Sequence, residues 1–384
     1  MIESQKSQFQ LDEEVTYLNC AYMGPILRKV EEIGKQSISA KLNPSDISVE
    51  DFFNPTEDLR KEYAELINCS EPNRIVTIPS VSYGIANVVN NLLIPSGSKI
   101  IIVGEQFPSN AYPWFRAADA NGAKVEIISA PDTLQHRGRI WNEKILNAIN
   151  ENTSVVALPI CHWADGTLYD ISAIRQKTNL YGTALIIDGT QSVGALPFDW
   201  EEVQPDALIC AGYKWMLGGY SLGLACYGPK FDNGVPIEEN WINRKNSEDF
   251  AGLVEYEDQY QPGALRYEVG EHSNFILLPM LLESLRQIRT WGPENIQEYC
   301  KEITADAIER LRQGGYWIEN EMYRGYHLFG IRIPDGIKIG DIKNELTSTK
   351  IFVSYRGTSI RVAPYLYNTK EDLQKLADCL LKLI

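Results

Sequence analysis

The sequence predicts an α/β protein, with a large domain built on a mostly parallel sheet and a smaller α+β domain after it. First, short and almost continuously apolar runs recur between residues 72 and 228, a pattern typical of strands covered by helices on both faces. Second, amphipathic stretches separate these runs. Third, a chain of 384 residues exceeds what one hydrophobic core usually supports.

Seven runs are expected to form strands. In chain order they are RIVTI (74–78), KIIIVGE (99–105), AKVEIISA (123–130), SVVALPI (154–160), ALIIDGT (184–190), ALICAGY (207–213) and GLACYGP (223–229). The segment SYGIANVVNNLL after the first run predicts a helix, because residues 85, 88, 89, 92 and 93 would share one apolar face.

The chain beyond residue 228 changes in character. Residues 234–270 are rich in Glu, Asp, Asn, Gly and Tyr and lack periodicity, which indicates a long functional connection. Two helices are then expected, in residues 274–292 and 294–313. Three strands follow, YHLFGIRIP, KIFVSYR and SIRVAPY, and EDLQKLADCLLKLI predicts a last helix. This ending is typical of an α+β domain.

Composition narrows the class of protein. The net charge of −15 argues against a nucleic-acid partner, and no apolar run is long enough to cross a membrane. The polar start MIESQKSQFQ has no apolar core of a signal peptide, so a cytoplasmic protein is expected. Seven dispersed cysteines without a CxxC pair, and four scattered histidines, favour reduced thiols and no metal site.

The stretch CAGYKWMLGGYSLG places Lys214 among aromatic and small residues, where an uncompensated lysine is unusual. Asp188 ends the strand before it, at the edge of a parallel sheet where ligands gather. Ser80, Val81 and Ser82 lie between a strand and a helix, so they would offer free N–H groups and hydroxyls to an anion. Pyridoxal 5′-phosphate (PLP) needs this set: a lysine, a carboxylate for the pyridine nitrogen and a phosphate site.

These residues resemble the class V aminotransferases, a group that includes cysteine desulfurases, kynureninases and isopenicillin N epimerase-like enzymes. The stretch DGTQSVGALPFDWEEVQPDALICAGYKWMLGG is similar to the family signature over its whole length. The likeness continues in YLNCAYMGP, EQFPSNAYPW, RYEVGE and IRVAPYLYNTKEDLQKL, and so covers most of the chain.

The resemblance implies the PLP-dependent transferase fold of type I, with a seven-stranded sheet in the large domain. It further implies an N-terminal segment of residues 1–20 that joins the small domain and the active site, a PLP-binding domain of residues 21–262 and a C-terminal domain of residues 263–384. A homodimer with shared active sites is expected.

The resemblance also assigns roles to residues. Lys214 would carry PLP, Asp188 would pair with its ring nitrogen, and Gln191 would reach its ring hydroxyl oxygen. Ser80, Val81, Ser82, Phe107, Tyr213 and Asp165 would complete the cofactor site, although Asp165 could instead make the turn before Gly166. Arg361 and Asn19 would bind the substrate, and the nearby Arg356 is expected not to do so.

Departures from the relatives bear on the reaction. Tyr213 and Phe107 stand where desulfurases have histidines, and no cysteine lies between residues 301 and 378, so the usual desulfurase reaction is not expected. Where relatives often have Gly-Thr, this chain has Gly270-Glu271, and Ser273 is a weak substitute.

The predicted function is that of a PLP-dependent enzyme acting at the Cα of an amino acid, and transamination is the preferred reaction. A C–S or C–C lyase or an epimerase is the alternative. A nicotinamide dehydrogenase is excluded because no strand precedes a GxGxxG motif. A cofactor-free aldolase would leave Asp188 and the Ser80–Ser82 stretch without a joint purpose. A non-catalytic binding protein on this fold is disfavoured because Lys214, Asp188, Gln191 and Arg361 are all present together.

Overall fold

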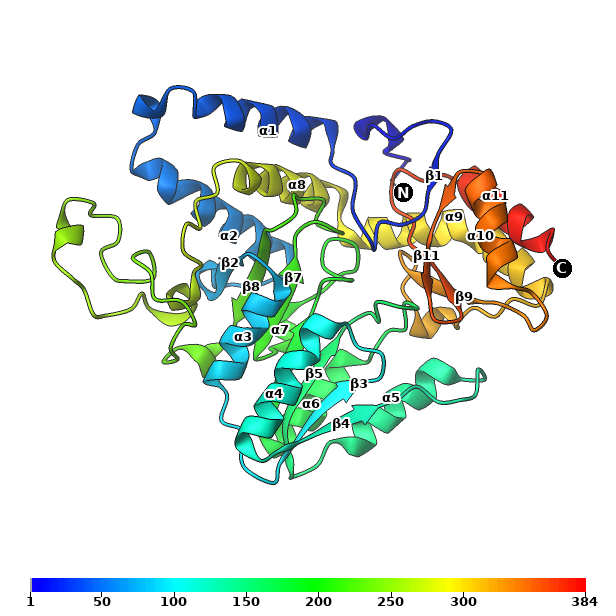
Figure 1. Cartoon of the computed structure of the whole chain (residues 1–384), viewed down its shortest axis with the longest axis horizontal. Coiled ribbons are helices and arrows are strands. Elements are labelled where there is room, and N and C mark those ends of the chain that lie inside the picture. The colour runs from blue at the N-terminus through cyan, green and yellow to red at the C-terminus, as the bar shows by residue number, and fades with distance from the viewer. Residues whose placement is uncertain (1) are drawn as a thin grey trace.

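The computed structural model describes residues 2–384 and contains a seven-stranded sheet in the order β2-β8-β7-β6-β5-β3-β4 (Figure 1). Its strands are β2 (Ile75–Ile78), β3 (Lys99–Val103), β4 (Lys124–Ile128), β5 (Thr153–Pro159), β6 (Ala184–Asp188), β7 (Ala207–Ala211) and β8 (Gly223–Tyr227). The strands from β7 to β4 are parallel, whereas β8 runs antiparallel to both β7 and β2. The predicted mostly parallel sheet is confirmed, with one strand in each predicted run.

Helices cover both faces of this sheet. One face packs against α3 (Val81–Asn91) and α4 (Tyr112–Asn121). The helices that pack against the other face are α2 (Asn54–Leu66), α5 (Arg137–Ala148), α6 (Ile171–Tyr181), α7 (Trp200–Val203) and α8 (Leu277–Trp291). Within β3, Ile100 and Ile102 belong to the first core, and Ile101 and Val103 belong to the second. This double burial is why the central strands β6 and β7 are almost continuously apolar, whereas the edge strand β4, which is partly exposed, contains Lys124 and Glu126.

Helix α3 ends earlier than its apolar face suggests. The last helical residue is Asn91, whose side chain hydrogen-bonds the backbone of Val235 as donor and as acceptor. Leu93 therefore lies outside the helix and is 88% exposed, so its expected place on the apolar face is wrong.

The C-terminal part of the chain combines helices with a small antiparallel sheet of order β11-β12-β9, as expected. Its elements are α9 (Pro293–Gln313), β9 (Phe329–Arg332), α10 (Ile339–Ser348), β10 (Ile351–Phe352), β11 (Ser354–Arg356), β12 (Ser359–Val362) and α11 (Lys370–Leu381). Helix α10 is absent from the prediction. The run KIFVSYR forms two short strands, because β10 pairs with the N-terminal segment and β11 pairs with β12.

The N-terminal segment links the small sheet region to the large one. Strand β1 (Thr16–Tyr17) pairs in parallel with β10, and Asn19 forms a bridge with Ala363. Further along, Gly24 donates to the carbonyl of Tyr213 at 3.0 Å, and a Cβ at Gly24 would lie 2.0 Å from the carbonyl oxygen of Lys214. Only glycine fits this close approach. The domain boundaries at residues 20 and 262 stay predictions.

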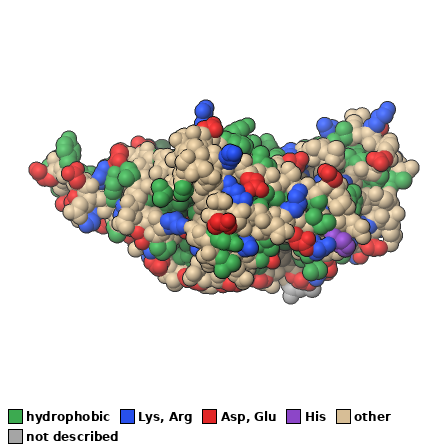
Figure 2. Space-filling model, turned by 90° about the horizontal axis from the view of Figure 1, so that it is seen from below, with side chains coloured by type: hydrophobic (Ala, Val, Ile, Leu, Met, Phe, Trp, Pro, Cys, Tyr) green, Lys and Arg blue, Asp and Glu red, His purple; other side chains and the backbone are tan. Residues whose placement is uncertain are grey.

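Two further features appear in the figures. Helix α1 (Arg28–Ala40) runs beside α8 on the outside of the molecule, and residues 234–270 form a long excursion at the end opposite the C-terminus (Figure 1). On the face in Figure 2, acidic and basic side chains are interspersed.

Among residues 2–384, no helix has the length and apolar character that would let it cross a membrane.

Candidate active site

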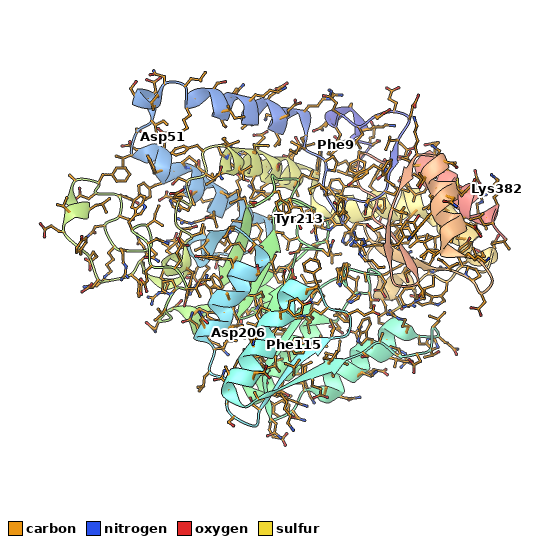
Figure 3. The ribbon with its side chains drawn as sticks, in the orientation of Figure 1. Phe9, Asp51, Phe115, Asp206, Tyr213 and Lys382 are labelled. Carbon is orange, nitrogen blue, oxygen red and sulfur yellow. The ribbon has the colours of Figure 1, made fainter. Side chains whose placement is uncertain are left out.

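A cavity opens at the carboxyl ends of the central strands, where the chain leaves β6 and β7. Asp188, Thr190 and Gln191 come from the end of β6, and Ala211, Tyr213 and Lys214 come from the end of β7. The labelled Tyr213 in Figure 3 lies near the middle of the molecule, between the sheet and the helices above it. The start of α3 and residues between 106 and 110 also line the wall. The cavity thus brings Lys214, Asp188, Gln191, Ser80, Val81, Ser82, Phe107 and Tyr213 together.

Lys214 is 7% exposed, and its Nζ atom lies 5.4 Å from the ring centroid of Phe107 and 5.6 Å from that of Tyr213. Burial lowers the pKa of the ammonium to about 8, with Asp188 acting in the opposite direction and Arg361 and Arg356 adding to the decrease. Because part of the lysine is a neutral amine near neutral pH, it can act as a nucleophile toward an aldehyde.

Asp188 is 6% exposed, and its Oδ1 atom accepts a hydrogen bond from the Thr190 N–H at 3.0 Å. Burial raises the pKa of this carboxyl, while Thr190 and Lys214 counteract the increase. The carboxylate lies on the cavity wall without a cation in ion-pair contact among the described residues. A buried acid of this kind suits a cationic ring nitrogen.

The start of α3 supplies the groups expected for a phosphate. Ser80 is the N-cap residue, and its Oγ atom accepts a hydrogen bond from the Tyr83 N–H at 3.2 Å. The Ser80 and Ser82 hydroxyls lie 2.9 Å apart, and both residues line the cavity together with Val81. The N–H groups in the first turn of a helix have no partner within it, so this end of the cavity favours an anion.

A second cavity adjoins the first and shares Phe107, Tyr213 and Lys214 with it. Arg361 of β12 lies on its wall, although this residue is only 1% exposed. The guanidinium donates to the Trp163 carbonyl at 2.9 Å and to the Ser354 hydroxyl at 3.2 Å. Its Nε–H has no partner within residues 2–384. This buried cation is therefore free to receive a carboxylate.

Asn19 supports Arg361 from the N-terminal segment. Its Oδ1 atom accepts hydrogen bonds from the Ser354 hydroxyl at 2.8 Å and from Arg361 at 3.5 Å. Asn19 is 8% exposed and is absent from the walls of both cavities. In this structure it orients the arginine, and its direct contact with substrate stays a prediction.

Aromatic rings surround the point where the two cavities meet. Besides Phe107 and Tyr213, the structure places Trp163 and Tyr220 on both walls. The ring centroids of Trp163 and Phe107 lie 5.4 Å apart, and those of Tyr213 and Tyr220 lie 4.5 Å apart. Trp163 and Tyr220 are not among the site residues predicted from sequence, since an aromatic residue in a loop belongs to no periodic pattern.

Gln191 lines the first cavity and also ties two segments together. Its amide donates to the carbonyl of Ala21 at 3.1 Å and accepts from the Trp215 indole at 2.8 Å. One amide N–H remains for a ligand, as the expected contact with a ring oxygen requires.

Asp165 lies apart from both cavities, and the structure supports its alternative role in a turn. Its carboxylate pairs with Arg137 at 2.9 Å, contacts His162 at 3.2 Å and accepts from the Thr167 hydroxyl at 2.8 Å. Burial opposes ionisation, yet His162 and Arg137 hold the pKa of this carboxyl below its usual value. With both oxygens occupied, Asp165 shapes the turn before Gly166.

The described residues fit PLP together with an amino-acid substrate on three grounds. Lys214 and Asp188 are buried, face one cavity and have no ion-pair partner among residues 2–384. The first turn of α3 supplies an anion site at the same cavity. Arg361 adds an unpaired buried cation in the adjoining cavity, where a substrate carboxylate could bind.

The fold is that of the PLP-dependent enzymes of fold type I. A structure of a C-DES mutant, with glycine covalently linked to the PLP cofactor, matches 99% of this chain and 100% of its own length with a TM-score of 0.86 at 17% identity. The Escherichia coli cysteine desulfurase CsdA matches 98% of this chain and 97% of its own length, with a TM-score of 0.82 at 18% identity. These identities support the fold alone.

The chain belongs to the aminotransferase class-V family, whose model matches residues 48–376. The predicted family is confirmed. A relative described as an uncharacterized aminotransferase, YcbU of Bacillus subtilis (strain 168), is 25% identical over 92% of this chain and 94% of its own length.

Proposed function

We propose that this protein is a PLP-dependent enzyme that acts at the Cα atom of an amino acid, and that the reaction it catalyses is transamination. One observation carries the proposal: Lys214 and Asp188 face the same cavity, both buried and neither in an ion pair within the described chain. Leaving two such groups without a bound partner is costly, and a ligand that satisfies both explains the arrangement.

In this proposal each group of the chain has a separate task. Lys214 would hold PLP covalently, and its Nζ atom would move the proton at the substrate Cα. Asp188 holds a proton on the ring nitrogen, and Ser80, Val81 and Ser82 bind the phosphate. When bound, PLP supplies an electron sink for the charge that bond breaking leaves at Cα.

Arg361 has the task of orienting the substrate. A guanidinium can grip a carboxylate with two parallel hydrogen bonds, which fixes the position of the attached Cα. Phe107 and Trp163 line the region between this arginine and Lys214, where they would exclude water. The proposed partner is thus a small amino acid.

A lyase or an epimerase is the alternative, because both also begin by breaking a bond at Cα. A desulfurase with a nucleophilic cysteine is less well supported. All seven cysteines in the described chain are buried. Cys20 is 3.9 Å from the carbonyl oxygen of Lys214, but burial raises the pKa of its thiol to about 12. Such a thiol is a poor nucleophile.

A product assay tests the proposal. The purified protein, loaded with PLP, is incubated with single amino acids, with and without a keto-acid acceptor. Keto acid that forms only with the acceptor supports transamination. Ammonia or sulfide formed without it, or inversion at Cα, supports the alternative. If no amino acid changes and none alters the visible spectrum, the proposal is wrong.

Arg361→Lys is expected to raise KM for the amino acid and to lower kcat, with the cofactor spectrum unchanged. Lysine keeps the charge but cannot form the two parallel hydrogen bonds. The loss in kcat/KM is expected to be about 2–4 kcal/mol, the cost of damaging a desolvated charge-assisted pair. Burial and the nearby Arg356 lower the pKa of Arg361 to about 9, so the wild-type guanidinium stays charged at neutral pH.

The matched control is Arg332→Lys. Arg332 also lies in the small sheet, with its guanidinium 5.7 Å from the Trp317 ring centroid, and it lines neither cavity. Steady-state kinetics of both variants test whether Arg361 binds the substrate carboxylate. Wild-type kinetics in the Arg361 variant would exclude this role.

We also propose a homodimer with shared active sites, and sedimentation should give twice the 43.4 kDa mass of one chain. The segment of residues 234–270 extends from the body of the molecule (Figure 1), and it leaves Val254 78% and Tyr256 98% exposed. Exposed apolar side chains of this kind suit a partner surface. Replacing both with aspartate is expected to favour the monomer. An active wild-type monomer at assay concentration would contradict the dimer.

A further inference from the structure

The second cavity contains more positive charge than one amino-acid carboxylate requires. Its walls include Lys214, Arg356 and Arg361, and the described lining includes no aspartate or glutamate. Of the two arginines, only Arg361 is predicted from sequence to bind substrate. Since Lys214 is assigned to the cofactor and Arg361 to the α-carboxylate, the Arg356 guanidinium remains without an anionic partner.

The strand register explains why the two arginines share this cavity. Strands β11 and β12 are antiparallel, with Ser354 opposite Arg361 and Arg356 opposite Ser359. Paired residues and residues two apart on a strand point to the same face of a sheet, so Arg356 and Arg361 leave the hairpin on one side. Figure 1 shows β11 on the side of the small domain nearest to the large sheet.

Trp163 holds both arginines in place. Its carbonyl accepts from Arg361 at 2.9 Å, and its ring centroid lies 5.0 Å from the Arg356 guanidinium carbon. Arg356 Nη1 donates to the carbonyl of Tyr355 at 2.7 Å, while its buried Nε–H has no partner within residues 2–384. The half-buried guanidinium is therefore positioned by stacking and still has donors to offer.

We propose that Arg356 binds a second carboxylate on the substrate, so that the preferred substrates are amino acids with an acidic side chain. The inference rests on the proposed function, since it assigns Lys214 to PLP and Arg361 to the α-carboxylate. A neutral side chain would leave Arg356 unpaired beside two other cations, whereas a dicarboxylic amino acid brings one carboxylate for each arginine.

Kinetics with matched substrates provide the first test. Wild-type holoenzyme is assayed with glutamate and aspartate against glutamine and asparagine, which have nearly the same shape without the charge. The acidic substrates are expected to have the higher kcat/KM. In Arg356→Gln, that value should fall about 10- to 100-fold for the acids, through KM, and change less than about threefold for the amides. Arg356→Lys should retain part of the preference.

Arg332→Gln is the matched control, because Arg332 lies on β9, where it is paired with Ser359, and is also near a tryptophan ring, yet it lines neither cavity. It should keep the wild-type preference. The inference is overturned if the wild type uses the amides as well as the acids, or if Arg356→Gln damages both substrate classes equally.

A binding measurement separates this inference from the proposed function. Calorimetry compares glutarate with valerate, which differ by one carboxylate and need no turnover. Glutarate should bind at least about 10-fold more tightly to the wild type, and the difference should vanish in Arg356→Gln. Equal binding of both acids to the wild type overturns the inference, even where PLP binds and amino acids react. Glutarate preference in a protein that fails to react with amino acids supports the two-arginine site and contradicts only the proposed reaction.

Discussion

Lys214→Ala is expected to lower turnover of every amino acid at least about 1000-fold, because the variant loses both the attachment of PLP and the group that moves the Cα proton. The fold should survive. A lysine whose pKa is lowered by burial, here to about 8, opposes folding at the pH where it is charged. The cofactor-free variant at pH 7 should therefore be no easier to unfold by urea than the wild type.

Lys177→Ala serves as the control, because Lys177 also lies near a tyrosine ring, 5.7 Å from the centroid of Tyr181, and lines neither cavity. It should keep wild-type activity. The lowered pKa also sets the pH dependence of the wild type: capture of PLP should accelerate about tenfold per pH unit and level off above about pH 8, where the amine is neutral. Full turnover in Lys214→Ala would refute the proposed role.

Asp188→Asn is expected to lower kcat about 100- to 1000-fold while PLP still binds, the usual cost of removing one preorganised electrostatic group. A neutral amide cannot hold a proton on a pyridine nitrogen. Burial raises the pKa of Asp188, so in the cofactor-free protein its ionised form opposes folding at neutral pH. The cofactor-free variant should thus be as stable as the wild type or more stable at pH 7, and this difference should disappear as pH falls and the wild-type carboxyl is protonated.

Asp206→Asn is a contrasting control at the other end of β7 (Figure 3). The Asp206 carboxylate pairs with Arg175 at 3.1 Å and with Lys230 at 3.2 Å, and accepts from the Leu185 N–H at 2.8 Å. Its substitution should lower the free energy of unfolding and leave kcat unchanged. Rapid kinetics and urea unfolding distinguish the two aspartates, and an unchanged kcat in Asp188→Asn would exclude its role at the ring nitrogen.

Much of the large sheet follows from sequence, because its central strands are buried on both faces and are therefore almost continuously apolar, unlike the segments between them. The cavity residues at strand ends follow too, since the chain must turn where β6 and β7 end and Asp188 and Lys214 lie at or just beyond those ends. Helix α10 could also have been predicted from sequence, because Ile339, Ile342 and Leu346 share one face at helical spacing.

Other features depend on contacts between distant segments. Helix α3 ends at Asn91, whose side chain hydrogen-bonds the backbone of Val235. No local sequence pattern predicts a contact with so distant a residue. From sequence, Asp165 is predicted to contact the cofactor. Its contacts with Arg137 and His162, which occupy the carboxylate, are visible only in the structure. The position of Arg356 in the second cavity could be recognised only from the register of β11 and β12, because the pairing shows that it shares a face with Arg361.

The most direct measurement is to identify the residue that PLP modifies. The purified protein is loaded with PLP, reduced with borohydride and digested, and its peptides are analysed by mass spectrometry. We expect the visible absorption band to disappear on reduction and the added mass to lie on Lys214, in the peptide that contains CAGYKWM. A protein that acquires no such band, or that carries the modification on exposed lysines while Lys214 stays unmodified, would contradict the account.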